Sequence, residues 1–169
     1  MPLRHRIARA VAFAGPARVA QWDLEVLREA LQSCPWVLDE LEERGDRVQA
    51  RVGATLGPLG DLDDLTRSST LDALTLRVFA PGEVVVEKGA PGTGIMVIGG
   101  GSVEVADDGA RETLGCGDPL FASAALSGSP APGAARAGAG GALLLVADRR
   151  GTQGLITSLP TLLELLASS

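Results

Sequence analysis

The chain has 169 residues, 46% of them hydrophobic, which is enough for one packed core with a small helical extension. A net charge of −6 argues against nucleic-acid binding, whose usual mark is a basic face, and 3% aromatic residues with no Tyr argue against a surface on which bases stack. No apolar run is long enough to cross a bilayer, and Cys34 and Cys116 are too few for a disulfide framework, so we expect a soluble, cytoplasmic protein without nucleic-acid binding or membrane insertion.

The first predicted element is a short amphipathic helix near the N-terminus. Apolar residues recur there at helical spacing, at Leu3, Ile7, Val11 and Ala14. Arg9 interrupts the apolar stretch, which excludes a secretory signal peptide, and Gly15-Pro16 ends the helix. The helix packs on its own domain, docks on a partner protein or lies on a membrane surface, and the sequence leaves these alternatives open.

The segment from Trp22 to Leu62 predicts further amphipathic helices, rich in acidic residues and interrupted at Ser33-Cys34-Pro35. Each helix is expected to bury one apolar face. The stripes are Leu24, Leu27 and Leu31, then Val37, Leu38 and Leu41, and last Val48, Val52, Leu56 and Leu59. The end of the segment resembles a HEAT-type repeat, but solenoids need about three copies, so we expect a helical cap on the domain that follows.

Short β-branched runs separated by turn residues fill the stretch from Leu71 to Val105. Pro81-Gly82, Gly92 and Gly101 are expected in turns. Alternation with a period of two predicts an inner face, with Met96 on the opposite side; the inner residues are Val84, Val86, Ile95, Val97 and Val103. An Asp-Gly turn predicts a hairpin between residues 102–106 and 110–114.

Three motifs in this stretch carry a family resemblance: FAPGE at residues 79–83, EKGAPG at 87–92 and IGGGSV at 98–103. Their order is similar to the first hairpins of the cyclic-nucleotide-binding domain family, which includes the catabolite activator proteins and the regulatory subunits of cyclic-nucleotide-dependent kinases. The resemblance implies an α+β fold, an antiparallel β-roll or jelly roll with an N-terminal helical region and short C-terminal helices. We expect residues 1–65 to form the helical region and residues 66–169 the roll.

The family's phosphate-binding cassette reads G-D-x-F-G-E-x-A-L, followed by P-R-x-A, and this chain departs from it. GDPLFASAAL at residues 117–126 keeps the Gly-Asp opening, but Ala122 stands where the family places the Glu that holds the ribose hydroxyl. Ala131 replaces the Arg that pairs with the cyclic phosphate. Because an Arg–phosphate pair is among the stronger polar contacts a protein makes, we expect the cassette to have lost its cyclic nucleotide.

A shifted alignment would give Arg136 the role of the missing Arg. The spacing disfavours it, since Arg136 lies only seven residues before the apolar strand that begins at Leu143. If the chain does bind an anionic ligand, the expected residues are Gly117, Asp118, Ser123 and Arg136. The small residues of 127–141 predict a partly mobile loop, and the order loop-then-strand excludes a dinucleotide-binding loop.

The end of the chain predicts apolar helices, at Leu155-Ile156 and from Leu159 to Leu166, with Pro160 as a first helical residue. Family transcription factors continue into a helix-turn-helix domain, whereas this sequence ends at Ser169. We therefore expect any regulation to act through another polypeptide.

Little in the sequence supports a catalytic site or a metal site. His5 is the only histidine and lies far from every predicted strand, so neither a cupin metal site nor a Ser-His-Asp relay can form. The acids Asp61, Asp63 and Asp64 lack the spacing of an EF-hand loop and are expected to be solvated. We expect no enzymatic activity, metal or cofactor.

Two functions remain after these exclusions. The first is a structural or adaptor protein that uses a degenerate cyclic-nucleotide-binding fold to bind a protein partner in a larger assembly or regulatory complex. Trp22 and Trp36 are its candidate interaction residues, because Trp is enriched at interface hot spots. The alternative is a sensor of a cyclic nucleotide or another small ligand that acts on a separate effector. The lost anchors at Ala122 and Ala131 favour the first.

Overall fold

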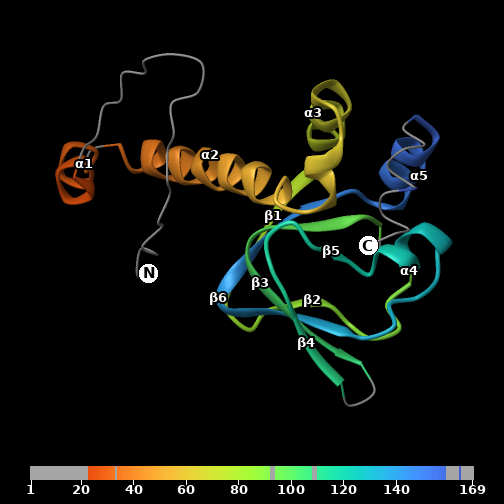
Figure 1. Cartoon of the computed structure of the whole chain (residues 1–169). Helices are drawn as coiled ribbons and strands as arrows, with labels where there is room; N and C mark the ends of the chain where they lie inside the picture. Colours follow the sequence, from red (N-terminus) through yellow and green to blue (C-terminus); the bar gives the residue numbers. More distant parts are fainter. Residues whose placement is uncertain (1–22, 33, 92–93, 108–109, 159–163, 165–169) are drawn as a thin grey trace. The chain divides into compact units, whose positions relative to one another are not determined.

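The computed structural model describes residues 23–32, 34–91, 94–107, 110–158 and 164. Helices come first, at α1 (Leu24–Ala30), α2 (Pro35–Ala54), the 3₁₀ turn η1 (Pro58–Asp61) and α3 (Asp64–Asp72). Strands and two helices follow, at β1 (Thr75–Phe79), β2 (Val84–Val86), β3 (Met96–Asp107), β4 (Ala110–Leu114), β5 (Pro119–Leu120), α4 (Ala122–Ser127), β6 (Ala134–Val146) and α5 (Arg149–Ser158). This is the predicted α+β fold, an antiparallel β-roll with helices before and after it (Figure 1).

The chain divides into two compact units, Met1–Glu40 and Leu41–Ser169. In the first unit, the Asp23 carboxylate accepts a hydrogen bond from the Glu25 N–H and caps α1. Pro35 begins α2, as a proline can at the first helical position, which confirms the predicted interruption before it. The second unit holds the strands together with the rest of α2, so residues 41–65 share its compact fold.

All strand pairs in the second unit are antiparallel. The order is β1-β6-β3-β4, while β2 pairs with β6 and β5 with β3. The predicted hairpin is confirmed, since β3 and β4 pair from Val103–Leu114 to Asp107–Ala110. Within the FAPGE motif, the Glu83 carboxylate accepts a hydrogen bond from the Ala80 N–H at 2.7 Å. The motif is bound to β6 through the Ala137 N–H, which donates to the Glu83 carbonyl at 2.8 Å.

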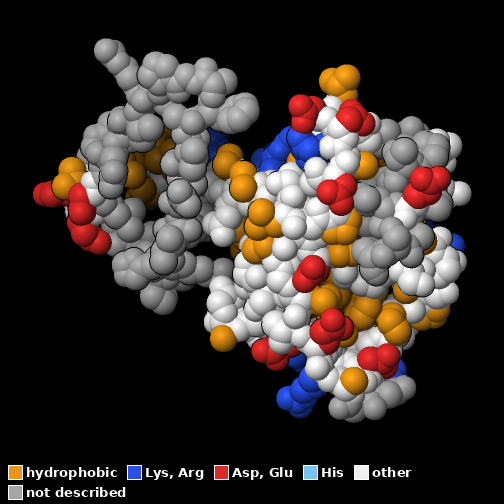
Figure 2. Space-filling view, viewed as in Figure 1, with side chains coloured by type: hydrophobic (Ala, Val, Ile, Leu, Met, Phe, Trp, Pro, Cys, Tyr) orange, Lys and Arg blue, Asp and Glu red, His pale blue; other side chains and the backbone are white. Residues whose placement is uncertain are grey.

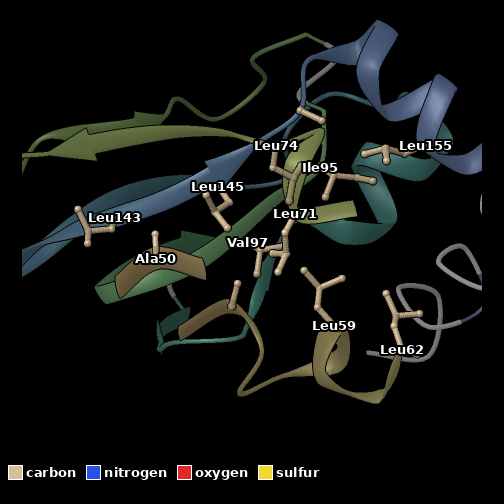
Figure 3. Close-up of a cluster of buried hydrophobic side chains, with 12 residues drawn as sticks. Ala50, Leu59, Leu62, Leu71, Leu74, Ile95, Val97, Leu143, Leu145 and Leu155 are labelled. Carbon is tan, nitrogen blue, oxygen red and sulfur yellow. The ribbon is translucent and has the colours of Figure 1, made fainter. Parts of the chain in front are cut away.

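The sheet is buried on both faces by two groups of side chains. The helix-side cluster joins the outer face of the sheet to α2, η1, α3 and α5 (Figure 3); it consists of Ala50, Ala54, Leu59, Leu62, Leu71, Leu74, Ile95, Val97, Leu143, Leu145, Ala147 and Leu155. The roll cluster fills the inside of the roll; it consists of Phe79, Val86, Met96, Ile98, Val103, Leu120, Ala131, Ala135, Ala137, Ala142 and Leu144. The η1 turn thus contributes Leu59 to the core, as expected of a helical cap.

The predicted inner face of β3 is wrong in part. Val103 lies in the roll cluster as expected, but Val97 packs against the helices and Met96 faces into the roll. The reason is that β3 carries two register irregularities, between Ile98 and Gly100 and between Gly101 and Val103, which shift the alternation of its side chains.

Two turn and loop predictions are also corrected. Gly101, with φ of +73°, lies inside β3 at one of these irregularities and not in a turn, and Gly92 lies outside the described residues. Residues 134–141 form the first half of β6 and not a mobile loop. Small residues are suited to this strand because its neighbours approach closely: a Cβ on Gly101 would lie 2.0 Å from the Gly141 carbonyl oxygen.

The predicted buried stripe of α2 is wrong too. Val48 and Val52 are exposed, as is Leu56 just beyond the helix. The buried face consists instead of Ala50, Gly53 and Ala54, because a Cβ on Gly53 would lie only 1.9 Å from the Gly99 carbonyl oxygen. A helix that approaches β3 this closely leaves no room for larger side chains on that face.

Candidate functional site

The segment that aligns with the phosphate-binding cassette opens with a tight turn between β4 and β5. Gly117 has φ of +94°, its N–H donates to the Ile98 carbonyl at 2.7 Å, and a Cβ on it would lie 2.2 Å from the Gly57 nitrogen. The Asp118 carboxylate accepts from the Gly115 N–H at 2.8 Å. Both residues of the Gly-Asp opening therefore hold the turn together.

Phe121 follows β5 and precedes α4 in an unusual backbone conformation. With φ of 52° and ψ of 41°, it is the only described residue other than glycine with a positive φ. It occupies the position that the family pattern gives to Gly, and a left-handed residue with a Cβ costs about 1–2 kcal/mol. Its partly buried ring packs against the roll cluster, which offsets that cost. Phe121 was not among the predicted site residues, although its place at the Gly of the family pattern was a signal in the sequence.

Ala131 replaces the phosphate-binding Arg of the pattern and is buried inside the roll, with 2% of its surface exposed. Its backbone pairs with the loop after β2: its N–H donates to the Ala90 carbonyl at 3.0 Å, and its carbonyl accepts from the Gly89 N–H at 2.9 Å. The side chains that pack around it are those of the roll cluster, and the buried polar side chains of the described residues, Thr70 and Thr152, lie outside that cluster. A buried anion at this place would lack a cation to pair with, which is strongly unfavourable.

Ala122, at the position of the ribose-binding Glu, begins α4 and packs against the helix-side cluster. Its methyl group offers no acceptor for a sugar hydroxyl. The next residue, Ser123, is exposed on α4, and its carbonyl accepts from the Ser127 hydroxyl at 2.8 Å.

Arg136 lies on β6 between Ala135 and Ala137, which are both buried in the roll cluster. Because side chains alternate along a strand, the exposed Arg136 side chain leaves by the outer face of β6. Its register partners are Glu104 on β3 and Val84 on β2. Of the four candidate ligand residues, Gly117 and Asp118 are therefore adjacent in one turn, whereas Arg136 lies on the side of β6 that faces away from the roll cluster.

The acidic residues near α3 have structural partners. The Asp63 carboxylate caps α3 by accepting from the N–H groups of Leu65 and Thr66, each at 3.1 Å. The hydrogen bonds from Thr66 in particular lower the pKa of Asp63 below its usual value. Asp64 pairs with Arg67. Within the described residues no three His, Cys, Asp or Glu side chains gather as a metal site would require, and His5 lies outside them.

The structure describes one of the two residues predicted to contact a partner. Trp22 lies outside the described residues. Trp36 lies in the first turn of α2 with 65% of its surface exposed. In the described part of the chain, no helix is both long and apolar enough to span a bilayer.

Comparison with solved structures identifies the fold. The chain is similar to the catabolite activator protein of Thermus thermophilus, with 23% identity, a TM-score of 0.59, and coverage of 66% of this chain and 55% of that one. It is also similar to the regulatory domain of Toxoplasma gondii PKA with cAMP, with 20% identity, a TM-score of 0.58, and coverage of 74% and 51%.

A third similar structure is the N-terminal domain of a transcriptional regulator from Streptomyces coelicolor A3(2), with 20% identity, a TM-score of 0.55, and coverage of 68% and 86%. The chain thus spans about half the length of the first two proteins and most of the third. No family model and no curated protein matches the sequence. The fold is the β-roll of cyclic-nucleotide-binding domains, as the sequence motifs predicted.

Proposed function

Because the fold is the β-roll of cyclic-nucleotide-binding domains, we propose that this chain is a non-catalytic adaptor or regulatory module whose roll does not bind a cyclic nucleotide. The observation that carries the proposal is the burial of Ala131 in an apolar cluster, at the place of the phosphate-binding Arg. Ala122 removes the second polar anchor, and the ring of Phe121 packs into the roll where the pattern has Gly.

The free energies of the two lost contacts support this proposal. A hydrogen bond to a charged group contributes about 1.5–3 kcal/mol, so the loss of each anchor weakens binding by about one to two orders of magnitude. The loss of both weakens binding by about two to four orders of magnitude, which moves a micromolar ligand to an affinity of about 0.1 mM or weaker. The exposed Arg136 does not compensate, because its side chain leaves the strand on the outer face.

The protein then acts by contacting another polypeptide in the cytoplasm. The helices between Leu3 and Leu62 are the favoured surface, with Trp22 and Trp36 as its first candidates. The exposure of Trp36 supports this choice, because a large apolar ring on the surface of a helix is available to a partner.

Isothermal titration calorimetry tests the proposal. Titration of cAMP and of cGMP into the full chain should give no saturable heat with ligand concentrations up to about 0.1 mM, given the two lost contacts. The regulatory domain of Toxoplasma gondii PKA titrated with cAMP under the same conditions is the positive control. A dissociation constant in the micromolar range for either nucleotide would overturn the proposal and favour a ligand sensor that acts on a separate effector.

A further inference from the structure

Phe121 is held in a backbone conformation that a residue with a side chain disfavours. Its φ of 52° and ψ of 41° lie in the left-handed region, and no other described residue except glycine has a positive φ. Backbone strain of this kind persists only where the surrounding packing imposes it. Some contact of Phe121 is therefore worth more to the fold than an unstrained backbone.

The left-handed backbone turns the Phe121 ring into the roll. Leu120, the last residue of β5, is fully buried in the roll cluster. Because successive side chains of an extended chain point to opposite sides, an extended Phe121 would leave on the side opposite Leu120. Its ring packs instead against the same cluster as Leu120, and the next side chain, Ala122, packs against the helix-side cluster. The strained residue is thus the point at which the chain passes from one core cluster to the other.

The Phe121 ring lies at the rim of the roll. This name denotes the partly buried apolar side chains that pack against the roll cluster: Val85, Ala90, Val105, Leu114, Phe121 and Val146. Phe121 is the largest of them and the only one with a ring. Figure 2 shows hydrophobic side chains that reach the surface over the roll, in the area between β5 and β2 of Figure 1. The ring therefore covers part of the buried cluster and separates it from solvent.

We propose that the Phe121 ring is an internal plug of the roll: it fills, from within the chain, a place that an uncharged aromatic molecule of its size would otherwise take. The class of molecule follows from the surroundings. The roll cluster offers apolar contacts, and the buried polar side chains of the described residues, Thr70 and Thr152, are uncharged and lie outside it, so a charged molecule would be buried without a partner. The plug rests on the proposed function, since it is what occupies the roll of a chain that binds no cyclic nucleotide.

Phe121→Gly removes the plug, and glycine adopts the left-handed backbone without strain. Toluene, which matches the phenylalanine side chain, is the probe. The thermal unfolding midpoint of the full-length variant should lie below that of the wild type and should rise by about 2 °C or more in about 5 mM toluene, as expected of a ligand that binds the folded state. The wild-type midpoint should not rise, because its own ring occupies the place. Trp36→Ala is the matched control, because it removes a ring that is 65% exposed and should show no rise.

Phe121→Ala also lacks the ring and isolates the backbone strain. It should unfold at a lower urea concentration than Phe121→Gly, because alanine retains the cost of the left-handed conformation. Phe121→Leu, which keeps part of the apolar contact, serves in the toluene measurement if Phe121→Gly fails to fold by circular dichroism.

A ring-deleted variant whose midpoint does not rise in toluene, or a wild-type midpoint that rises as much, would overturn the plug. Either result would leave the proposed function standing, because cyclic-nucleotide titration of the wild-type chain tests that function separately. Micromolar binding of cAMP by Phe121→Gly, with none by the wild type, would support the plug and would overturn the role given to the two lost anchors.

Discussion

Glycines set the distance between the end of α2 and the sheet. A Cβ on Gly53 would lie 1.9 Å from the Gly99 carbonyl oxygen, and a Cβ on Gly99 would lie 2.4 Å from the Ala50 carbonyl oxygen. The same pattern recurs one segment later, where Gly57 meets Gly117. These contacts bring the backbone of the helix directly against the backbone of the roll.

We therefore expect Gly53→Ala to destabilise the protein by about 1–3 kcal/mol, the usual cost of overpacking a core. Gly154→Ala is the matched control, because a Cβ on Gly154 in α5 would meet no atom within 4 Å, and alanine should there add about 0.5–1 kcal/mol of helix stability. Urea unfolding followed by circular dichroism measures both. Equal stability of Gly53→Ala and wild type would show that α2 does not approach β3 this closely.

Among the elements, the strands show what the sequence could and could not predict. The Pro-Gly-Glu turn and the Asp-Gly hairpin were predictable, because the residues that make them are neighbours in the chain. The faces of β3 and the first half of β6 were not, because they depend on register irregularities and on the approach of Gly101 to Gly141, forty residues away. Val48, Val52 and Leu56 were predicted to be buried for the same reason: only the fold reveals that small residues form the packed face of α2.

Removal of N-terminal segments tests how the elements depend on one another. A chain that begins at Leu41 should fold, because it retains the whole second compact unit. A chain that lacks residues 1–62 should not, because it loses Ala50, Ala54, Leu59 and Leu62 from the helix-side cluster. Circular dichroism and thermal unfolding of the two truncated chains measure the difference.

Cooperative unfolding of the shorter chain near the wild-type midpoint would contradict this dependence and would show that residues 63–169 fold without α2 and η1. The longer truncated chain lacks both Trp22 and Trp36. If it folds and yet recovers every native partner, those tryptophans do not carry the protein contact.

At the scale of the whole molecule, the residues that serve the fold match the family pattern better than those that serve its ligand. Glu83 and Gly117 make the turn contacts described above. Ala122 and Ala131 replace the two polar anchors, and Phe121 adopts a left-handed conformation that packs its ring into the roll. The sequence predicted the loss of the anchors, but not that Arg136 would leave on the outer face, since that depends on the alternation of a strand whose start was not recognised.

The most direct test of this account is a titration of the ¹⁵N-labelled full chain with cAMP and then cGMP at millimolar concentrations, followed by amide chemical shifts. This measurement detects binding too weak for calorimetry and locates it along the chain. We expect no shift that saturates below about 0.1 mM ligand among the amides of residues 117–137, because the inside of the roll is an apolar cluster without a cation for the phosphate and the two lost contacts leave at most weak binding. Shifts that saturate at micromolar ligand and gather in those residues would contradict the account, since they would show that the roll still holds a nucleotide.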